Sequence, residues 1–482
     1  DSIGAYLSYN FDTPTEVELK IGISYVSIEN ARKNLEQETE NRSFSDIYQQ
    51  TASQWNELLS KIKVEGGTKD DKTVFYTALY HTLIHPSILN DVNGEFPAMG
   101  NRQTRKTKGT RYTVFSLWDT YRNLHSLMSL VYPKQQLDMV NSMLDIYDES
   151  GWLPKWELNA TETTTMVGDP AGIVIADTYL RGIRNFDVEK GYGAMVKSAD
   201  QLADNPLRPG IKNYLEKGYL TTSNGGSVST TQEYNISDFA IAQLAKALGK
   251  TADVDRFSKR SISYRKLYDK DFKLLRPRND DGSWHKPFDP MAGANFTENI
   301  GFIEGNSWQY SFMVSHDVGG LMKLMGGKKS FTDQLQTVFD NDHFDMANEP
   351  DMGYPYLFNY VKGEEWRTQK TVNELRKTYF KNSPDGLPGN DDTGVMSAWI
   401  IYSMMGFYPI SPADPMYTLT TPLFDKITIS LDPTYYKNPT LTIEKEGRGE
   451  LREILLNGKK HQGFFIEHAE LVNGQALKFI NQ

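Results

Sequence analysis

Helical spacing governs the sequence from about residue 30 to about residue 410. Apolar residues recur there every three or four positions, in roughly twelve stretches of ordinary helix length. The stretches begin near Phe44, Thr73, Trp118, Lys134, Pro170, Val188, Thr230, Ala252, Trp308, Phe331, Thr368 and Asp392. Because short turns alternate with long loops between them, we predict a mainly α fold in which six helical hairpins close into an (α/α)6 toroid.

The N-terminal end has the alternating pattern of a β-strand instead. Val17, Leu19, Ile21, Ile23 and Tyr25 alternate with polar neighbours, which predicts a strand with one buried face. One or two strands cannot form a stable sheet. Partner strands must therefore come from upstream sequence or from the C-terminal end, and we expect most of an N-terminal β domain to lie outside these residues.

Alternation returns after Pro412. Ile427 and Ile429 have polar neighbours, and the pairs Asn457-Gly458 and Asn473-Gly474 are typical of hairpin turns between apolar runs. Residues 411–482 are therefore predicted to form a small C-terminal β region.

Charge and cysteine content narrow the possible functions. The 482 residues include 52 Lys and Arg against 62 Asp and Glu, a net charge of −10 with both signs scattered along the chain. This balance argues against a nucleic-acid surface and against anionic membranes. The chain has no cysteine, so a bound metal must have oxygen or imidazole ligands. The longest apolar stretch, 395–410, is too short and too mixed to span a bilayer.

The loops between the predicted helices are unusually long. They contain most of the tryptophan, glycine and acidic residues, and loops of this length in a compact domain are more often functional than idle. They span residues 150–169, 205–229, 273–306, 341–366 and 382–391.

One of these loops ends in a carboxylate that is followed by aromatic and amide side chains. Glu304 and Gly305 precede Trp308 and Tyr310 at the start of a predicted helix. A carboxyl group beside these rings would be partly desolvated, which raises its pKa and favours the protonated form that a general acid needs. Alternatively, Glu304 is an ordinary acidic residue that meets the dipole of a helix N-terminus.

Two further loops carry clustered oxygen donors. Asp391 and Asp392 are adjacent before an apolar helix, and neighbouring carboxylates repel unless a metal, a cation or a catalytic water uses them. The alternative is that one of them caps the helix and the other is solvated. Residues 347–351 (ANEPD) offer hard oxygen donors suited to calcium, although such a cluster alone is usually an ordinary turn.

Charged groups also lie beside tryptophans, at Trp118-Asp119 and at Trp156-Glu157. Sugars are recognised by a flat indole against the ring and by carboxylates that bind the hydroxyls. For a single tryptophan, burial beside an ion pair is the more common situation. Several such motifs in the loops of one toroid favour sugar binding.

The remaining motifs exclude other chemistries. His316 could orient a substrate hydroxyl or serve as a structural histidine. Zinc is disfavoured, because His81 and His85 are the one closely spaced histidine pair and lack the glutamate of a metalloprotease helix. The sequence contains neither a nucleotide-binding glycine loop nor a serine-hydrolase elbow. Separated carboxylates in aromatic loops therefore favour glycoside hydrolysis, in which one acid protonates the leaving oxygen and another activates water.

Many of these strings, in this order, resemble glycoside hydrolase family 92, the calcium-dependent exo-acting α-mannosidases. The similarity runs through nearly the whole chain. Its clearest motifs are residues 21–27, 116–122, 151–156, 304–310, 389–394 and 396–399.

The resemblance implies an N-terminal β-sandwich, a linker helix, an (α/α)6 catalytic barrel and release of mannose with inversion. Applied to this chain, it implies a remnant of the sandwich at residues 1–28, a linker helix region at 29–65, the barrel at 66–410 and the β region at 411–482. The missing part of the sandwich is expected to pack on the barrel and to contribute to the rim of the active site.

The resemblance also implies roles for single residues. Glu304 is similar to the general acid of the family. The acidic pair is similar to the general-base region, with Asp392 as the base and Asp391 positioning it or its water. The residues expected to bind substrate are Trp118, Asp119, Trp156, His316 and Asn390.

Calcium is the cofactor that the resemblance implies. It is expected near Asn348 and Glu349, with Asn306 or Gln309 as further ligands, and would bind the 2- and 3-hydroxyls of mannose and distort its ring toward the transition state.

The first functional hypothesis is thus an inverting, calcium-dependent exo-α-mannosidase that acts on α-mannosides of mannan or N-glycans, with α-1,2 linkages favoured. The alternatives are another toroid glycosidase, a phosphorylase, which would need a basic phosphate pocket, and a non-catalytic glycan-binding protein. The family's usual setting implies a bacterial protein that is periplasmic or extracellular.

Overall fold

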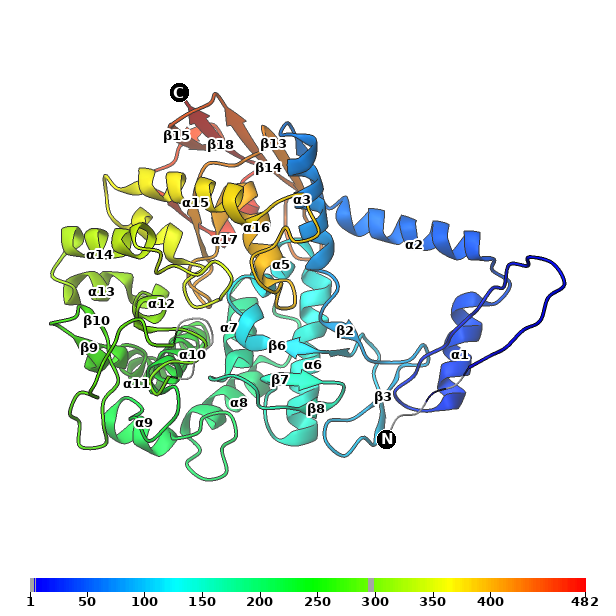
Figure 1. Cartoon of the computed structure of the whole chain (residues 1–482), viewed down its shortest axis with the longest axis horizontal. Coiled ribbons are helices and arrows are strands. Elements are labelled where there is room, and N and C mark those ends of the chain that lie inside the picture. Colours follow the sequence, from blue (N-terminus) through cyan, green and yellow to red (C-terminus); the bar gives the residue numbers. More distant parts are fainter. Residues whose placement is uncertain (1–3, 5, 294–298) are drawn as a thin grey trace.

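The computed structural model describes residue 4, residues 6–293 and residues 299–482, and most of them form a double ring of helices (Figure 1). The inner elements are α5 (Leu124–Val131), α7 (Pro170–Leu180), α10 (Ser227–Ala247), α12 (Ser307–Ser311), the 3-10 helix η4 (Tyr354–Tyr360) and α16 (Val395–Met405). The outer helices are α3 (Lys69–His81), α6 (Pro133–Ser150), α8 (Val188–Asp200), α11 (Thr251–Ser261), α14 (Lys328–Asp340) and α15 (Glu365–Tyr379). The predicted (α/α)6 toroid is confirmed.

Burial distinguishes the two rings. Every residue of α5 and α16 is buried, whereas α14 and α15 alternate buried and exposed positions. A helix that is apolar on all sides must be surrounded by protein, and an amphipathic helix covers the outside. The short elements between the ring helices are α4 (Leu117–Thr120), α9 (Ile211–Lys217), η1 (Ser263–Leu267), η3 (Ser315–Asp317) and α13 (Val318–Leu324).

Contacts between neighbouring inner elements close the ring. Helix α7 packs against α5 and α10, and Gln232 of α10 donates to the carbonyl of Tyr310 at 2.8 Å. The indole of Trp399 in α16 donates to the carbonyl of Met352 beside η4 at 2.8 Å. Helix α16 also packs on α3 and α5, so the last helix of the ring meets the first. Gly394, with φ of +98°, permits this closure, because a Cβ there would lie 3.1 Å from the Cα of Thr82.

The C-terminal β region is also confirmed. One sheet has the order β1-β13-β14-β18-β15-β16, with β14 and β18 parallel and the other pairs antiparallel. Its strands are β1 (Ile62–Glu65), β13 (Lys426–Ser430), β14 (Thr440–Glu446), β15 (Leu451–Leu456), β16 (Lys459–Lys460) and β18 (Ala476–Asn481). A smaller sheet contains β11 (Phe407–Tyr408), β12 (Met416–Leu419) and β17 (Phe465–Glu467). Strand β1, from the predicted linker region, therefore belongs to the C-terminal sheet.

The two predicted hairpin turns have different outcomes. Asn457 and Gly458 have φ of 51° and 73° and join β15 to β16, as predicted. The prediction for Asn473-Gly474 is wrong, because these residues end helix α17 (His468–Asn473). The apolar residues before the turn, Leu471 and Val472, are buried on one side of that helix.

The strand predicted between Val17 and Tyr25 is not formed. The side chains of Val17, Leu19, Ile21 and Ile23 are exposed, and no described strand runs beside them. Alternating residues need a partner strand for their backbone groups and a core for their apolar face, and the described chain provides neither here.

The linker region forms two helices, α1 (Ile28–Thr39) and α2 (Phe44–Leu59), of which α2 projects from the helical body in Figure 1. Polar contacts attach α1 to the toroid. The buried carboxylate of Asp91 accepts hydrogen bonds from Ser24 at 2.7 Å, Asn30 at 2.8 Å and Asn34 at 2.7 Å.

Three short strand pairs and one three-stranded sheet lie in the loops between the described helices. They are β2 (Ser87–Ile88) with β5 (Tyr112–Thr113), β3 (Glu95–Pro97) with β4 (Thr104–Lys106), β6 (Phe115–Ser116) with β7 (Trp156–Leu158) and β8 (Thr161–Glu162), and β9 (Tyr268–Asp269) with β10 (Leu274–Leu275).

None of the described helices combines the length and the apolar character needed to cross a membrane.

The pairing of β1 with β13 leads to a first prediction. Ile62 is fully buried opposite Ile429, so Ile62→Ala should lower the free energy of unfolding by about 2–5 kcal/mol through lost burial and the cavity left behind. Urea denaturation measures this change. Ile88→Ala, at a position that is 62% exposed, should change it by no more than about 0.5 kcal/mol. Equal effects of the two substitutions would show that β1 contributes no more than a surface segment.

Candidate active site

The predicted acidic site residues lie just before elements of the inner ring. Glu304 precedes α12, Glu349 precedes η4, Asp392 precedes α16, and Asp119 lies in α4 before α5. In an (α/α)6 toroid the inner helices run in the same direction, so the loops that precede them meet at one end of the ring. The charge of Asp392 acts on the pKa of the other three carboxyl groups, and the charge of Glu304 acts on Asp119. Carboxylates that are far apart in the sequence therefore share one site.

Glu304 occupies a constrained turn. Its φ of 47° is in the left-handed region, which is uncommon for glutamate and often found at functional positions. Its carbonyl accepts a hydrogen bond from the side chain of Asn348, and the carbonyl of Ile303 accepts one from Tyr310 at 2.6 Å. Burial raises the pKa of the Glu304 carboxyl, and the charge of Asp392 raises it further. This carboxyl group is suited to hold a proton.

The structure separates the two adjacent aspartates. Asp391 accepts a hydrogen bond from the backbone N–H of Ser397 at 2.8 Å, and its other oxygen lies 3.8 Å from Nδ1 of His81. Asp392, with φ of 44°, belongs to the carboxylate cluster. Burial raises the pKa of Asp392, and a hydrogen bond with Glu349 acts in the opposite direction. Asp391 is therefore tied to α16, whereas Asp392 faces the other acids.

The neighbouring Asn390 is solvent-exposed at the end of the same loop. No hydrogen bond of its side chain occurs within the described part of the chain. Its predicted contact with substrate stays a prediction.

Asp119 is a deeply buried member of the carboxylate cluster. It is 2% exposed and accepts a hydrogen bond from Ser116. Burial raises the pKa of Asp119 to about 8, and the charges of Asp392 and Glu304 add to this effect, whereas the Ser116 hydroxyl opposes it. The group lies deep in the same site as the predicted acid and base.

The two predicted tryptophans differ in accessibility. Trp118 is 1% exposed, with the Arg122 guanidinium 4.7 Å from its ring, so its faces are covered by protein. Trp156 is partly exposed and lies opposite Ser116 in the β6-β7 pair, next to the residue that binds Asp119. Trp156 is therefore the better placed of the two to contact a ligand.

A buried ion pair between Arg122, from the 116–122 motif, and Glu233 supports the cluster, although no role was predicted for either residue. Nη2 of Arg122 lies 2.9 Å from Oε1 of Glu233, and Tyr121 donates to Oε2 of Glu233 at 2.9 Å. The charge of Arg122 acts on Asp119 and Glu349 and lowers the pKa of both. Burial nevertheless raises the pKa of Glu349 well above its usual range. The sequence contained one signal for this ion pair: Glu233 is an acidic residue within the otherwise uncharged first half of α10.

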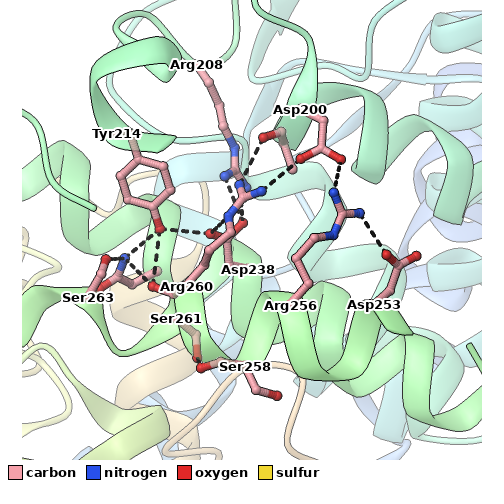
Figure 2. A network of polar contacts seen from close by, with 12 residues as sticks. Asp200, Arg208, Tyr214, Asp238, Asp253, Arg256, Ser258, Arg260, Ser261 and Ser263 are labelled. Atoms are coloured by element: carbon pink, nitrogen blue, oxygen red, sulfur yellow. Dashed lines mark hydrogen bonds and ion pairs between the residues drawn. The ribbon is translucent and has the colours of Figure 1, made fainter. Parts of the chain in front are cut away.

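A network of ion pairs connects α8, α10 and α11, and α10 also carries Glu233. Arg208 is fully buried and bridges Asp169 at 2.9 Å and Asp238 at 2.8 Å. Figure 2 shows Asp238 between Arg208 and Arg260, and Asp200 between Arg260 and Arg256. Asp169 precedes Pro170 at the start of α7, but its side chain pairs with Arg208 and makes no cap hydrogen bond with that helix.

His316 makes its polar contact away from the carboxylates. Its Nε2 lies 2.8 Å from the carbonyl of Ser261 in α11, and its ring packs against Phe239 and Tyr264. Burial lowers the pKa of its imidazole. These contacts are those of a structural histidine that joins α11 to η3, and they give the predicted role in substrate binding no support.

The residues expected to hold calcium divide into two pairs. Asn306 and Gln309 form a capping box at α12: the Asn306 side chain accepts from the N–H of Trp308 and Gln309, and that of Gln309 accepts from the N–H of Asn306 at 3.0 Å. Their oxygens are thus already used. Glu349 is 2% exposed, and its Oε1 has no hydrogen-bond partner among the described residues, beside Asn348.

A cation would fit at Glu349 by charge, because the charges of Asp119 and Asp392 act on Glu349 and the charge of Arg122 offsets them only in part. Within the described ranges, no group of three or more histidine or acidic side chains converges as a metal cluster. Backbone carbonyls, amide oxygens or ligand hydroxyls would therefore have to complete the coordination of an ion held by Glu349.

The family model and the similar solved structures agree on one family. Residues 30–480 match the model of the glycosyl hydrolase family 92 catalytic domain. An uncharacterized secreted glycosidase of the fungus Arthroderma benhamiae is 26% identical over 98% of this chain and 62% of its own. A family GH92 α-mannosidase structure from Bacteroides thetaiotaomicron is 33% identical, with a TM-score of 0.88 over 95% of this chain and 61% of its own.

A second structure from the same bacterium, a family GH92 inverting mannosidase, is 27% identical, with a TM-score of 0.87 over 95% of this chain and 65% of its own. The chain thus spans less than two thirds of the length of these relatives.

The Arg122–Glu233 pair leads to a second prediction. Glu233→Gln leaves a buried guanidinium without its counter-charge, which should lower the free energy of unfolding by about 3–5 kcal/mol in urea denaturation. The matched control is Glu216→Gln, which removes an exposed pair with Lys212 and should cost less than about 1 kcal/mol. Similar small losses for both would show that Glu233 is dispensable for the fold.

Proposed function

The chain belongs to glycosyl hydrolase family 92, and on this premise we propose that it is an exo-acting α-mannosidase that hydrolyses terminal α-mannosides with inversion of configuration. The observation that carries the proposal is the electrostatic coupling of Glu304 and Asp392, which come from loops almost ninety residues apart and share one partly buried site. Similarity to structures of α-mannosidases supports the choice of mannose.

Glu304 acts as the general acid in this proposal. Its raised pKa keeps the carboxyl protonated at a pH where an ordinary glutamate is ionised. The proton passes to the glycosidic oxygen as the bond from C1 to that oxygen breaks, so the leaving sugar departs as a neutral alcohol.

Asp392 acts as the general base. It takes a proton from the water whose oxygen forms the new bond to C1 on the opposite face of the sugar. Asp391, tied to Ser397 and close to His81, holds the turn that carries Asp392 and does not itself accept the proton. Inversion predicts a separation of about 6.5–9.5 Å between the acid and base carboxyl groups in the substrate complex, with room for water between them.

Asp119 and Trp156 bind the terminal sugar, by hydrogen bonds to hydroxyls and by contact with the ring. The Trp118 ring packs against the Arg122 guanidinium and supports the site through this contact. It does not stack on the sugar itself.

Calcium is the proposed cofactor. Glu349 and Asn348 would hold it, and Asn306 and Gln309 would fix the adjacent turn through their capping box. When bound, such an ion supplies positive charge for the hydroxyls of the sugar and for the surrounding carboxylates.

The finer assignments are part of the same proposal. The substrates are α-mannosides of mannan or N-glycans, with α-1,2 linkages preferred. The protein is periplasmic or extracellular, consistent with the secreted glycosidase that it is similar to. A β-sandwich that packs on the barrel completes the rim of the site.

Hydrolysis of a panel of α-linked mannobioses, followed by proton NMR, tests the proposed function. We expect β-mannose as the first product, because water attacks the face opposite the leaving group. Initial α-mannose would contradict inversion. Binding without cleavage of any linkage would instead favour a glycan-binding protein, and a strict need for phosphate would favour a phosphorylase.

The role of Glu304 gives a prediction about pH. With a mannobiose, kcat/KM should fall as pH rises through the raised pKa of Glu304, because the deprotonated group has no proton to give. Glu304→Gln should lower kcat about 10²- to 10⁴-fold on this substrate. A dinitrophenyl α-mannoside, whose leaving group needs no proton, should lose far less activity and show no such alkaline limb. An equal loss on both substrates would argue against Glu304 as the acid.

Removal of calcium gives a further prediction. Treatment with EDTA should abolish hydrolysis of an α-mannoside, and added calcium should restore it. Glu349→Gln should raise the calcium concentration needed for recovery, because it removes the charge of the proposed ligand. Activity that is unaffected by EDTA would exclude calcium from the catalytic role.

A further inference from the structure

A second hollow lies between the outer helix α15 and the ends of strands β14, β15 and β18 of the C-terminal sheet. Its volume is about 730 Å³, within the size range of small-ligand sites. Its walls come from α15, from the segment 420–423 and from the loop 447–450 between β14 and β15. It shares no lining residue with the carboxylate cluster described above.

Positive charge gathers in this hollow although the protein as a whole carries a net charge of −10. Lys370, Arg376, Lys445 and Arg448 line it, against Glu365 and Glu450. The charges of Arg376 and Arg448 both lower the pKa of Lys445, after the larger effect of burial, so the three cations are close enough to repel one another. Such a concentration of like charge is stabilised by a bound anion.

Carboxylates compensate these cations only weakly. The guanidinium of Arg376, which is 9% exposed, donates to the carbonyl of Ser403 at 2.9 Å and to the amide of Asn373 at 3.0 Å. Lys445 lies 3.8 Å from the carboxylate of Asp425. Arg448 makes no ion pair with any residue that the structure describes.

Neutral donors in the hollow also suit an oxyanion. Oε1 of Gln369 accepts hydrogen bonds from the hydroxyls of Thr420 and Thr421 and from the N–H of Thr421, so the amide nitrogen of Gln369 is directed elsewhere. That nitrogen is buried and has no acceptor among the described residues. A donor left in this state costs free energy unless a ligand or a water accepts its hydrogen bond.

Two aromatic side chains also line the hollow. Trp366 is 51% exposed and lines the hollow together with Phe464. An exposed indole next to charged donors is the combination by which proteins bind a sugar ring and its substituents together.

We propose that this hollow binds a phosphorylated sugar of a glycan, with the phosphate between Arg376, Lys445 and Arg448 and the sugar ring against Trp366. The site anchors the glycan on the outside of the toroid, away from the carboxylates that cleave it. The identity of the sugar rests on the proposed function, whereas the binding of the phosphate does not.

Isothermal titration of the whole protein tests the proposal with three probes: mannose 6-phosphate, inorganic phosphate and mannose. We expect mannose 6-phosphate to bind more tightly than inorganic phosphate, and mannose to bind weakly. Arg448→Gln and Lys445→Gln should each weaken the binding of mannose 6-phosphate about tenfold, because each removes a charge-assisted hydrogen bond. Trp366→Ala should weaken mannose 6-phosphate and leave inorganic phosphate unchanged.

Lys329→Gln is the matched control, since Lys329 lies on α14 with its side chain 88% exposed and outside the hollow. It should not change the binding of any probe. Arg448 lies in an exposed loop, so its variant should keep the melting temperature of the wild type.

Two results would overturn the proposal. Mannose 6-phosphate that does not bind, or that binds equally to the wild type and to the Arg448→Gln and Lys445→Gln variants, would exclude the phosphate site. Equal binding of inorganic phosphate and mannose 6-phosphate, unaffected by Trp366→Ala, would exclude recognition of the sugar. Hydrolysis of an uncharged mannobiose by the Arg448→Gln variant should equal that of the wild type, which separates this site from the catalytic one.

Discussion

The buried ion pair between Arg122 and Glu233 is the interaction on which the central site depends. Asp119, Glu304, Glu349 and Asp392 are carboxyl groups in one partly buried place, and Arg122 is the cation that acts on the deeply buried members. Desolvation makes every ionised acid there costly, and mutual repulsion adds to that cost. Glu233 holds Arg122 in position, and helix α10 joins this pair to the ion network of Arg208 and Arg260.

The same cost explains how the site can perform chemistry. Carboxyl groups that are expensive to ionise hold protons at higher pH, which a general acid requires, and at the proposed base Asp392 the hydrogen bond with Glu349 opposes this effect of burial. The left-handed conformations of Glu304 and Asp392 fit this view, since strained residues persist where the surrounding structure holds them. These groups cost stability at the end of the ring where their loops meet.

Sequence reasoning succeeded where the signal was local and repeated. Each of the predicted helix starts lies within a few residues of an observed helix, because an amphipathic period is a property of neighbouring residues. Predictions failed where the secondary structure of a segment depends on contacts with a distant part of the chain. Val17 to Tyr25 alternate like a strand but have no described strand to pair with, and Asn473-Gly474 ends a helix because Leu471 and Val472 pack on one side of it. The short helices α9 and α13 were missed because they are too brief for a period to appear.

The class of fold, the loops that carry the acids and the candidates Glu304, Asp391 and Asp392 could be predicted from the order of the residues, because periodicity and motif spacing are encoded along the chain. Which of these groups share a site depends instead on how the folded ring closes. Closure of the ring brings α16 against α3 and α5 and thereby sets Asp392 beside Glu304, ties Asp391 to the helix, and sends His316 to α11. Distances through space, burial and the resulting pKa shifts depend on contacts between distant segments, and no local pattern of residues records them.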